Sequence, residues 1–445
     1  MRTNLARKYP DPTNNEGVAT MRTKPIEQLQ RTVLACMLWE DSFYESGVTI
    51  ADRIKALVAE CDPVEVERLA ITAREQMKLR HAPLLLMREL ARHPKHPKFH
   101  DTLARVIQRA DELSEFVSIY WADAKTKDAR ARNPLSKQVK LGLAQAFTKF
   151  NAYALAKYNR DGAVKLKDVL FMCHAKPIDE AQALLWKQMI AGTLASPDTW
   201  EVALSAGADK RETFTRLIGE KKLGSLALLR NLRNMQESGV NPAIVRQALL
   251  DDAPKTKALP FRYIAAARAC PPWEPLLDEA MQISMSGMEK MVGRTVVLVD
   301  VSPSMDVKLS AKSDLTRIDA ACALAILVRG VCADARVFAF SSSIGEAPPR
   351  QGMALADAIR AAAPSNGTLL GAAVAYVNKI GYDRLIVVTD EESQDKVGGP
   401  IANGYMINVA TGQHGVGYGE WTKITGFSEA VISYIQASER EAARP

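Results

Sequence analysis

The pattern of apolar residues changes once along the chain, close to residue 290, and this change limits the possible folds more than any other feature. Before it, apolar side chains recur every three or four residues, as at Val66, Leu69, Ala70 and Ala73, which is the spacing of one helix face. After it, a continuous apolar run over Arg294–Ser302 is typical of a strand buried on both faces. We therefore predict a helical part followed by an α/β part.

Prolines mark the predicted starts of helices in the first part. A capping residue precedes proline at Asp62-Pro63, Asn133-Pro134, Ser196-Pro197 and Asn241-Pro242, which is typical of a helix N-terminus. Several intervals between such prolines lie near the roughly 40-residue period of HEAT-type helix pairs. We predict an all-α, HEAT-like array over residues 21–290, with an irregular helical domain as the alternative, and a flexible arm over residues 1–20.

Strands and helices are predicted to alternate over residues 291–445. The expected strands are residues 294–302, 336–341, 384–389 and 405–409, and the expected helices are residues 315–332, 354–363, 369–380 and 428–438. This alternation predicts a doubly wound, Rossmann-like parallel sheet. Ligands of such sheets bind beyond the carboxyl ends of the strands.

A candidate metal site lies at these strand ends. The first predicted strand runs into a DxSxS pattern, and a threonine and a strand-terminal aspartate follow in order: Asp300, Ser302, Ser304, Thr368 and Asp390. Carboxylates and hydroxyls are hard oxygen ligands suited to Mg²⁺ or Mn²⁺. A site that no longer binds metal and merely caps the strands is the alternative. A metal-dependent hydrolase is not favoured, because no general base is evident among these residues.

Positive charge is concentrated in the first part of the chain. The chain has a net charge of +7, yet residues 291–445 hold 14 basic and 16 acidic residues. Residues 125–176 alone hold 12 basic and three acidic residues, a net charge of +9. Such a segment indicates a polyanionic partner, with an ordinary solvated surface as the alternative.

Aromatic residues are interleaved with these cations. Phe147 and Phe150 are expected in the core, whereas Lys149, Tyr153 and Lys157 are four residues apart and are predicted to share one helix face. Cations bind phosphates while aromatic rings stack on unpaired bases, which is the chemistry of single-stranded RNA recognition. Charge and spacing therefore predict RNA-binding roles for four lysines: Lys149, Lys165, Lys167 and Lys176.

Other features restrict the class and location of the protein. No apolar run reaches the ~20 residues that span a bilayer, so no membrane association is expected. The six cysteines are scattered without a CxxC pair, which favours a reducing cytoplasm over a disulfide framework or a zinc site. His93, His96 and His100 lie in a run without carboxylates or cysteines, so a solvated basic loop is expected there rather than a metal site.

Several segments in order resemble one known family. The strand-end pattern resembles the metal-ion-dependent adhesion site of the von Willebrand A domain. A helical part of about 270 residues before such a domain resembles the Ro autoantigen (TROVE-domain) family. Short segments carry the resemblance further: Lys157-Tyr-Asn-Arg160-Asp-Gly, Lys167-Asp168-Val-Leu, His174-Ala-Lys176-Pro177 and Gly426-Phe427-Ser428. The resemblance covers about residues 20 to 440.

The resemblance implies a non-catalytic ribonucleoprotein scaffold for RNA quality control. Its helical repeats would form a ring closed by the A domain, with a small Y-type RNA on the basic outer surface and single-stranded 3′ ends of misfolded RNA in a central hole. Lys157, Arg160 and His174 match positions that contact RNA in the family. An exoribonuclease is an implied partner, and we expect a cytoplasmic monomer. A metal-dependent protein-interaction module without a physiological RNA ligand is the alternative.

The resemblance also implies how the metal would be held. In the family the two serines and the threonine ligate the cation directly or nearly so, and the aspartates act through water. Pro303, at the variable position of DxSxS, departs from the pattern in removing one backbone donor from the loop.

Overall fold

The computed structural model describes most of the chain in eight ranges. These are residues 24–35, 47–75, 79–122, 134–159, 162–256, 258–309, 314–410 and 421–425, together with residues 431, 432, 435, 436 and 439. Contacts divide the chain into two compact units, one of Ala51–Asp209 and one of Met1–Ile50 with Lys210–Pro445. We call them the helical unit and the sheet-containing unit. The domain boundary predicted at residue 290 rests on the change from helices to alternating strands and helices, and it stays a prediction.

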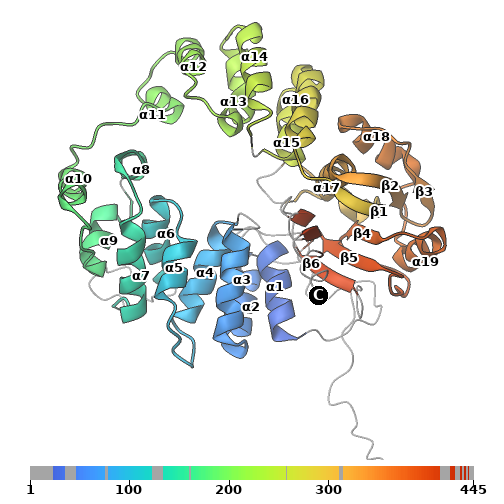
Figure 1. Cartoon of the computed structure of the whole chain (residues 1–445), viewed down its shortest axis with the longest axis horizontal. Coiled ribbons are helices and arrows are strands. Elements are labelled where there is room, and N and C mark those ends of the chain that lie inside the picture. The colour runs from blue at the N-terminus through green and yellow to red at the C-terminus, as the bar shows by residue number, and fades with distance from the viewer. Residues whose placement is uncertain are drawn as a thin grey trace, which may run out of the picture. The chain divides into compact units, whose positions relative to one another are not determined.

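The helical unit contains helices only among its described residues. They are α2 (Gly47–Glu60, shared with the other unit), α3 (Pro63–Glu75), α4 (His81–Leu90), α5 (His100–Val106), α6 (Asp111–Tyr120), α7 (Lys137–Phe147), α8 (Ala152–Tyr158), α9 (Leu166–Cys173), α10 (Glu180–Ala191) and α11 (Trp200–Ser205). Helices pack on their second neighbours, α3 on α5, α5 on α7 and α7 on α9, as expected of stacked helix pairs. Figure 1 shows this run in blue to green.

Two of the four predicted helix starts are confirmed and two are wrong. The Asp62 carboxylate accepts from the Val64 N–H at 2.9 Å where α3 begins, and Asn241 caps the helix that begins at Pro242 in the same way. In contrast, α7 and α11 begin later than predicted, because Ser136 and Thr199 cap them. In each case the cap is a hydroxyl side chain that follows the predicted proline by two residues.

A buried ion pair joins three helices of this unit. The Arg74 guanidinium on α3 donates to the Glu112 carboxylate on α6 at 2.6 Å, and both side chains are buried. The same arginine donates to the carbonyl of Val106 at the end of α5. The Glu112 carboxylate also accepts backbone N–H groups of Gln108 and Arg109. These bonds satisfy the buried charges, which would otherwise oppose folding.

The histidine run is only partly as predicted. It forms the connection between α4 and α5, as expected. His93 is not solvated, however: it is 2% exposed, and its Nε2 lies 3.2 Å from the carbonyl oxygen of Cys61. His100 Nδ1 lies 3.0 Å from the Gln138 side-chain oxygen. Both histidines fasten the loop to neighbouring helices.

The sheet-containing unit has its own helices before the sheet. They are α1 (Pro25–Ala35), α12 (Lys210–Gly219), α13 (Ser225–Glu237), α14 (Pro242–Asp252), α15 (Pro260–Ala269) and α16 (Glu274–Ser286), with a short 3₁₀ turn at Pro271–Trp273. Helix α13 packs on α14 and α15, and α15 packs on α16. The predicted helical part followed by an α/β part is confirmed, whereas closure of the helices into a ring stays a prediction.

Within the described ranges, six strands form one sheet in the order β3-β2-β1-β4-β5-β6. They are β1 (Met291–Asp300), β2 (Cys332–Phe340), β3 (Ile344–Glu346), β4 (Arg384–Thr389), β5 (Asn403–Asn408) and β6 (Trp421–Thr425). All pairs are parallel except β2 with β3. The predicted doubly wound sheet is confirmed, and the edge strands β3 and β6 were missed because each is only three to five residues long.

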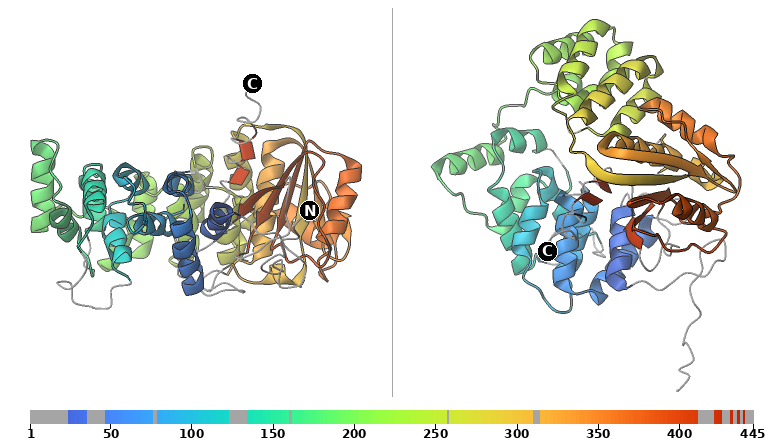
Figure 2. Two further views of the ribbon diagram at one scale, coloured as in Figure 1. Left: turned by 90° about the horizontal axis from the view of Figure 1, so that it is seen from below. Right: turned by 45° about the vertical axis from the view of Figure 1, so that its right-hand side comes forward.

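Helices cover both faces of this sheet. Val296 and Leu298 of β1 share a core with Leu370 and Val374 of α19 (Leu370–Ile380). On the other face, α17 (Arg317–Val331) contacts β1 and β2, and α18 (Met353–Ala362) contacts β2. Successive side chains of β1 thus point to opposite layers. Figure 2 shows the sheet and its helices, in yellow to red, from two further sides.

The last predicted helix, residues 428–438, lies mostly outside the described residues. Within the ranges that the structure describes, no helix is both long and apolar enough to span a bilayer.

Candidate metal centre and nucleic-acid interface

The end of β1 brings the DxSxS residues together. Asp300 is fully buried, and its Oδ1 accepts the Ser302 N–H at 2.9 Å. A 3₁₀ turn over Pro303–Asp306 follows and brings the Ser304 Oγ within 3.2 Å of the Ser302 Oγ. Proline suits the first position of this turn, since its fixed φ is already helical and its missing N–H is not needed there. The loop therefore gathers one carboxylate and two hydroxyls.

The Asp300 carboxyl is held in an unusual electrostatic setting. Burial, and then the nearby charge of Asp390, raise its pKa from 3.8 to about 7, although hydrogen bonds from Ser302 and Thr389 oppose this shift. The Thr389 Oγ1 donates to the Asp300 Oδ2 at 2.6 Å. Thr389 was not among the predicted metal residues, although it directly precedes Asp390 at the end of a predicted strand. A cation bound here would take the place of the proton on Asp300.

Asp390 directly follows β4, the strand next to β1 in the sheet. Its carboxylate forms an ion pair with an arginine. The Arg317 Nη1 lies 3.2 Å from the Asp390 Oδ2, and the two side chains are 3% and 0% exposed. The same nitrogen donates to the Ser304 carbonyl oxygen at 3.3 Å. No sequence signal identified Arg317. Its positive charge opposes a divalent cation at this site and holds Asp390 in place.

Thr368 reaches the same edge of the sheet through β2. The Leu369 N–H donates to the carbonyl of Ser341, directly after β2, at 2.7 Å. Gln394, beyond β4, both accepts the Thr368 N–H and donates its own N–H to the Thr368 carbonyl. Because β2 and β4 flank β1, Thr368 and Asp390 approach the Asp300 loop from two sides. The structure thus places all five predicted metal residues at one end of the sheet.

The donors at this edge fit a hard cation better than a zinc ion. They are hydroxyls and carboxylates. The described ranges contain no group of three or more His, Cys, Asp or Glu side chains that could hold a metal ion, so hydroxyls would have to supply most of the ligands here. Glu391 and Glu392 follow Asp390 directly and are buried, at 1% and 6% exposed. Mg²⁺ or Mn²⁺ therefore stays the predicted ligand, with Arg317 as the feature that weakens its binding.

The predicted helix face of Lys149, Tyr153 and Lys157 is wrong. Helix α7 ends at Phe147, and α8 begins at Ala152, because the Asn151 side chain caps α8 by accepting the Ala154 N–H at 2.9 Å. Lys149 lies between the helices, where its ammonium donates to the carbonyls of Ala104 and Ile107 near the end of α5. Burial lowers the pKa of this ammonium. Lys149 thus neutralises the carboxyl end of α5.

Helix α8 presents Tyr153 and Lys157 as a pair. Tyr153 is 54% exposed, and the Lys157 Nζ lies 5.9 Å from the centre of its ring and 5.8 Å from that of Tyr158. The ammonium also lies 4.0 Å from the Glu201 carboxylate. Phe147 and Phe150 are buried, as predicted. An exposed ring beside a cation is suited to contact both a base and a phosphate.

Helix α9 follows α8 in the chain and carries further exposed side chains. Lys167 and Phe171 are four residues apart in α9, so they share one helix face, and His174 follows the end of the helix; all three side chains are exposed. Phe171 is 59% exposed, and Ile178 beyond the helix is 72% exposed. Sequence reasoning missed both of these residues, because an isolated apolar residue gives no signal of exposure.

The remaining predicted RNA-binding residues are less uniform. Lys176 is exposed and Lys165 is half-buried at the start of α9, whereas Arg160 lies outside the described residues, as does the segment Gly426–Ser428. His174 ends α9 with a left-handed backbone, φ 54°. We define the α8–α9 surface as Tyr153, Lys157, Lys167, Phe171, His174 and Lys176.

Comparisons with known proteins bear on the whole chain. A family model described as the TROVE domain matches residues 182–271. The crystal structure of the Ro (RSR) protein of Deinococcus radiodurans matches with a TM-score of 0.63, covering 93% of this chain and 99% of that one at 19% identity. The predicted resemblance to the Ro family is confirmed. No curated protein matches the chain. The Ro likeness establishes the fold, and the TROVE match lies beyond the α8–α9 surface.

Proposed function

We propose that this protein binds RNA as a non-catalytic, Ro-like ribonucleoprotein scaffold. The TROVE match and the Ro-like fold support an RNA-binding protein of this family. The observation that carries the proposal is the α8–α9 surface, where the half-buried Lys157 and the exposed Lys167 and Lys176 accompany the exposed rings of Tyr153 and Phe171. Phosphates would bind Lys157, Lys167 and Lys176, while unpaired bases would stack on Tyr153 and Phe171.

The finer assignments belong to the same proposal. The basic surface would hold a small Y-type RNA, and single-stranded 3′ ends of misfolded RNA would enter a central hole formed by the helical repeats. The bound RNA would be held for quality control or passed to an exoribonuclease. We place the protein in the cytoplasm as a monomer. A Mg²⁺ or Mn²⁺ ion at Asp300, Ser302, Ser304, Thr368 and Asp390 would serve to grip a partner rather than to catalyse a reaction.

The α8–α9 surface is tested by removing its charge and its ring separately. The double variant Lys157→Ala, Lys167→Ala should weaken binding of a structured RNA and lower the slope of log affinity against log salt by roughly one unit per lost phosphate contact. Phe171→Ala should weaken binding by roughly 1–3 kcal/mol, because base stacking contributes that much, while leaving the salt slope unchanged.

Arg294→Ala is the matched control, since Arg294 is an exposed cation at the start of β1 in the sheet-containing unit. Its RNA affinity should equal that of the unmodified protein. Unchanged RNA affinity and an unchanged salt slope in the double lysine variant would show that the α8–α9 surface does not bind RNA. A weak, salt-insensitive affinity throughout would favour the alternative of a protein-interaction module, to which the exposed Phe171 and Ile178 would then belong.

A further inference from the structure

The Thr368 hydroxyl is a buried polar group for which the described residues supply no partner. The side chain is 6% exposed, and its Oγ1 makes no hydrogen bond with any described residue, whereas the N–H and the carbonyl of Thr368 are both bonded. Buried polar groups are normally hydrogen-bonded, so a hydroxyl without a partner points to a ligand or to water. The surrounding contacts show how this hydroxyl is held.

Gln394 bonds the main chain of Thr368 on both sides. Its side-chain Oε1 accepts the Thr368 N–H at 3.1 Å, and its own N–H donates to the Thr368 carbonyl at 2.9 Å. The next residue, Leu369, donates its N–H to the carbonyl of Ser341 at 2.7 Å. Thr368 is therefore fixed between the segment after β2 and the segment after β4, and only its side chain is left uncommitted.

The residue before Thr368 is a glycine, and it leaves room for the Gln394 amide. Gly367 has a left-handed backbone with φ 64°, and a Cβ at this position would lie 3.1 Å from the Gln394 Oε1. A side chain here would strain the backbone and press on the oxygen that accepts the Thr368 N–H. Gly367 and Gln394 thus form one arrangement around Thr368.

Asp395 anchors the same segment to α19. Its two carboxylate oxygens accept the N–H groups of Gly371 and Ala372, each at 2.8 Å, and the Ser393 Oγ donates to it at 2.8 Å. A carboxylate at the N-terminus of a helix is stabilised by the helix dipole. Residues 393–395 consequently link α19 to the segment that carries Asp390.

We propose that Gln394 is a positioning residue of the metal centre, which holds the Thr368 hydroxyl in place as a ligand of Mg²⁺ or Mn²⁺. This inference rests on the metal site of the proposed function. Gln394 does not bind the cation itself but acts through Thr368, as the hydrogen-bond partners of metal ligands commonly do. Its bonds fix Thr368 relative to Asp390 before an ion binds.

The test is Mn²⁺ binding by the full chain, measured from the electron paramagnetic resonance signal of the free ion. Gln394→Ala removes the acceptor of the Thr368 N–H and should weaken binding by roughly 10–100-fold, the usual effect of losing a residue that orients a metal ligand. Gln394 is exposed, so we expect this variant to fold. Gln394→Glu keeps an oxygen acceptor and should bind Mn²⁺ at least as tightly as the unmodified protein.

A double variant separates positioning from a general effect on the fold. Thr368→Val removes the hydroxyl and should weaken Mn²⁺ binding at least as much as Gln394→Ala does. If Gln394 acts through this hydroxyl, combining the two substitutions should cause no further loss beyond that of Thr368→Val. Losses that add would overturn the proposal, because Gln394 would then act on another part of the site.

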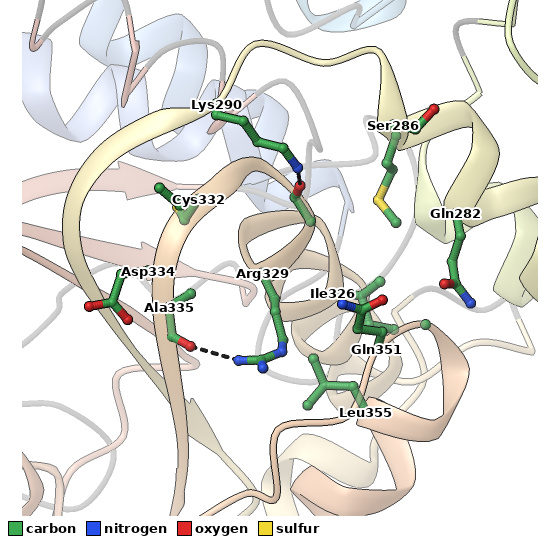
Figure 3. A pocket seen from close by; sticks show the side chains of 14 residues that line it. Gln282, Ser286, Lys290, Ile326, Arg329, Cys332, Asp334, Ala335, Gln351 and Leu355 are labelled. Carbon is green, nitrogen blue, oxygen red and sulfur yellow. Dashed lines mark hydrogen bonds between the residues drawn. The ribbon is translucent and has the colours of Figure 1, made fainter.

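Two controls test whether the effect belongs to this place in the molecule. Gln138→Ala removes a matched bond in the helical unit, where the Gln138 Oε1 accepts the Phe99 N–H at 3.3 Å. Asp334→Asn changes an exposed carboxylate in a pocket of about 510 Å³ at the start of β2, which Gln282 and Gln351 also line (Figure 3). Both variants should bind Mn²⁺ as the unmodified protein does. A loss in either would overturn the proposal, and a loss in Asp334→Asn would place the ion in that pocket.

The outcomes for the metal site and for Gln394 can be told apart. An unmodified protein that binds no Mn²⁺ would overturn both the metal site and the role of Gln394. If the unmodified protein binds Mn²⁺ and Gln394→Ala binds it equally well, the metal site stands and the role of Gln394 alone is wrong. Neither result depends on RNA binding.

Discussion

At the scale of single residues, the predicted metal centre combines side chains that favour a cation with one that opposes it. Asp300, Ser302 and Ser304 are held by short-range hydrogen bonds within one loop. Arg317 adds a buried positive charge against Asp390 and the Ser304 carbonyl. A divalent ion must therefore bind beside this guanidinium, which predicts modest affinity.

Arg317 gives a direct test of this balance. Arg317→Met keeps much of the volume but removes the buried positive charge beside Asp390, so we expect a loss of roughly 3–5 kcal/mol in the free energy of unfolding. Mn²⁺ should then restore part of the loss, because the ion can take over the neutralising role. The measurement is urea unfolding with and without Mn²⁺.

Arg336→Met is the control for this substitution. Arg336 pairs with Glu346 at 2.6 Å, but both side chains are nearly half exposed, so its loss should cost about 1 kcal/mol or less and respond to Mn²⁺ as the unmodified protein does. An Arg317→Met protein that gains no more stability from Mn²⁺ than this control would contradict the assigned role of Arg317.

At the scale of elements, the break between α7 and α8 decides what Lys149 does. Lys149→Met removes the ammonium that binds the Ala104 and Ile107 carbonyls, so we expect a loss of about 1–3 kcal/mol in the free energy of unfolding. RNA affinity and its salt slope should stay unchanged, because this ammonium is engaged within the protein. A flattened salt slope with unchanged stability would instead return Lys149 to the RNA-binding surface.

Sequence periodicity predicted the parallel strands but not the break between α7 and α8. The parallel strands were predictable because β1 and β4 are buried on both faces and read as unbroken apolar runs. A capping asparagine at residue 151 interrupts the helix, and spacing alone cannot show whether such a residue is used as a cap. The strand ends indicated Asp300 and Asp390, whereas Arg317 comes from a helix start whose distance from Asp390 depends on tertiary packing.

At the scale of the whole molecule, the chain combines two kinds of site in two compact units. The α8–α9 surface lies within Ala51–Asp209, and the metal centre lies within the sheet-containing unit. The Ro-like likeness extends over 93% of the chain, so the order of these parts follows a known fold. We propose that this arrangement serves RNA binding without catalysis.

The most direct test of this claim is RNA binding by the unmodified protein, titrated against salt. Two RNAs are compared, a structured hairpin with a single-stranded 3′ tail and the same hairpin without it. We predict tight binding that weakens steeply with salt, that improves with the tail, and that leaves both RNAs intact on recovery. Negligible binding of either RNA at moderate salt, or cleavage of the RNA during the titration, would contradict the account.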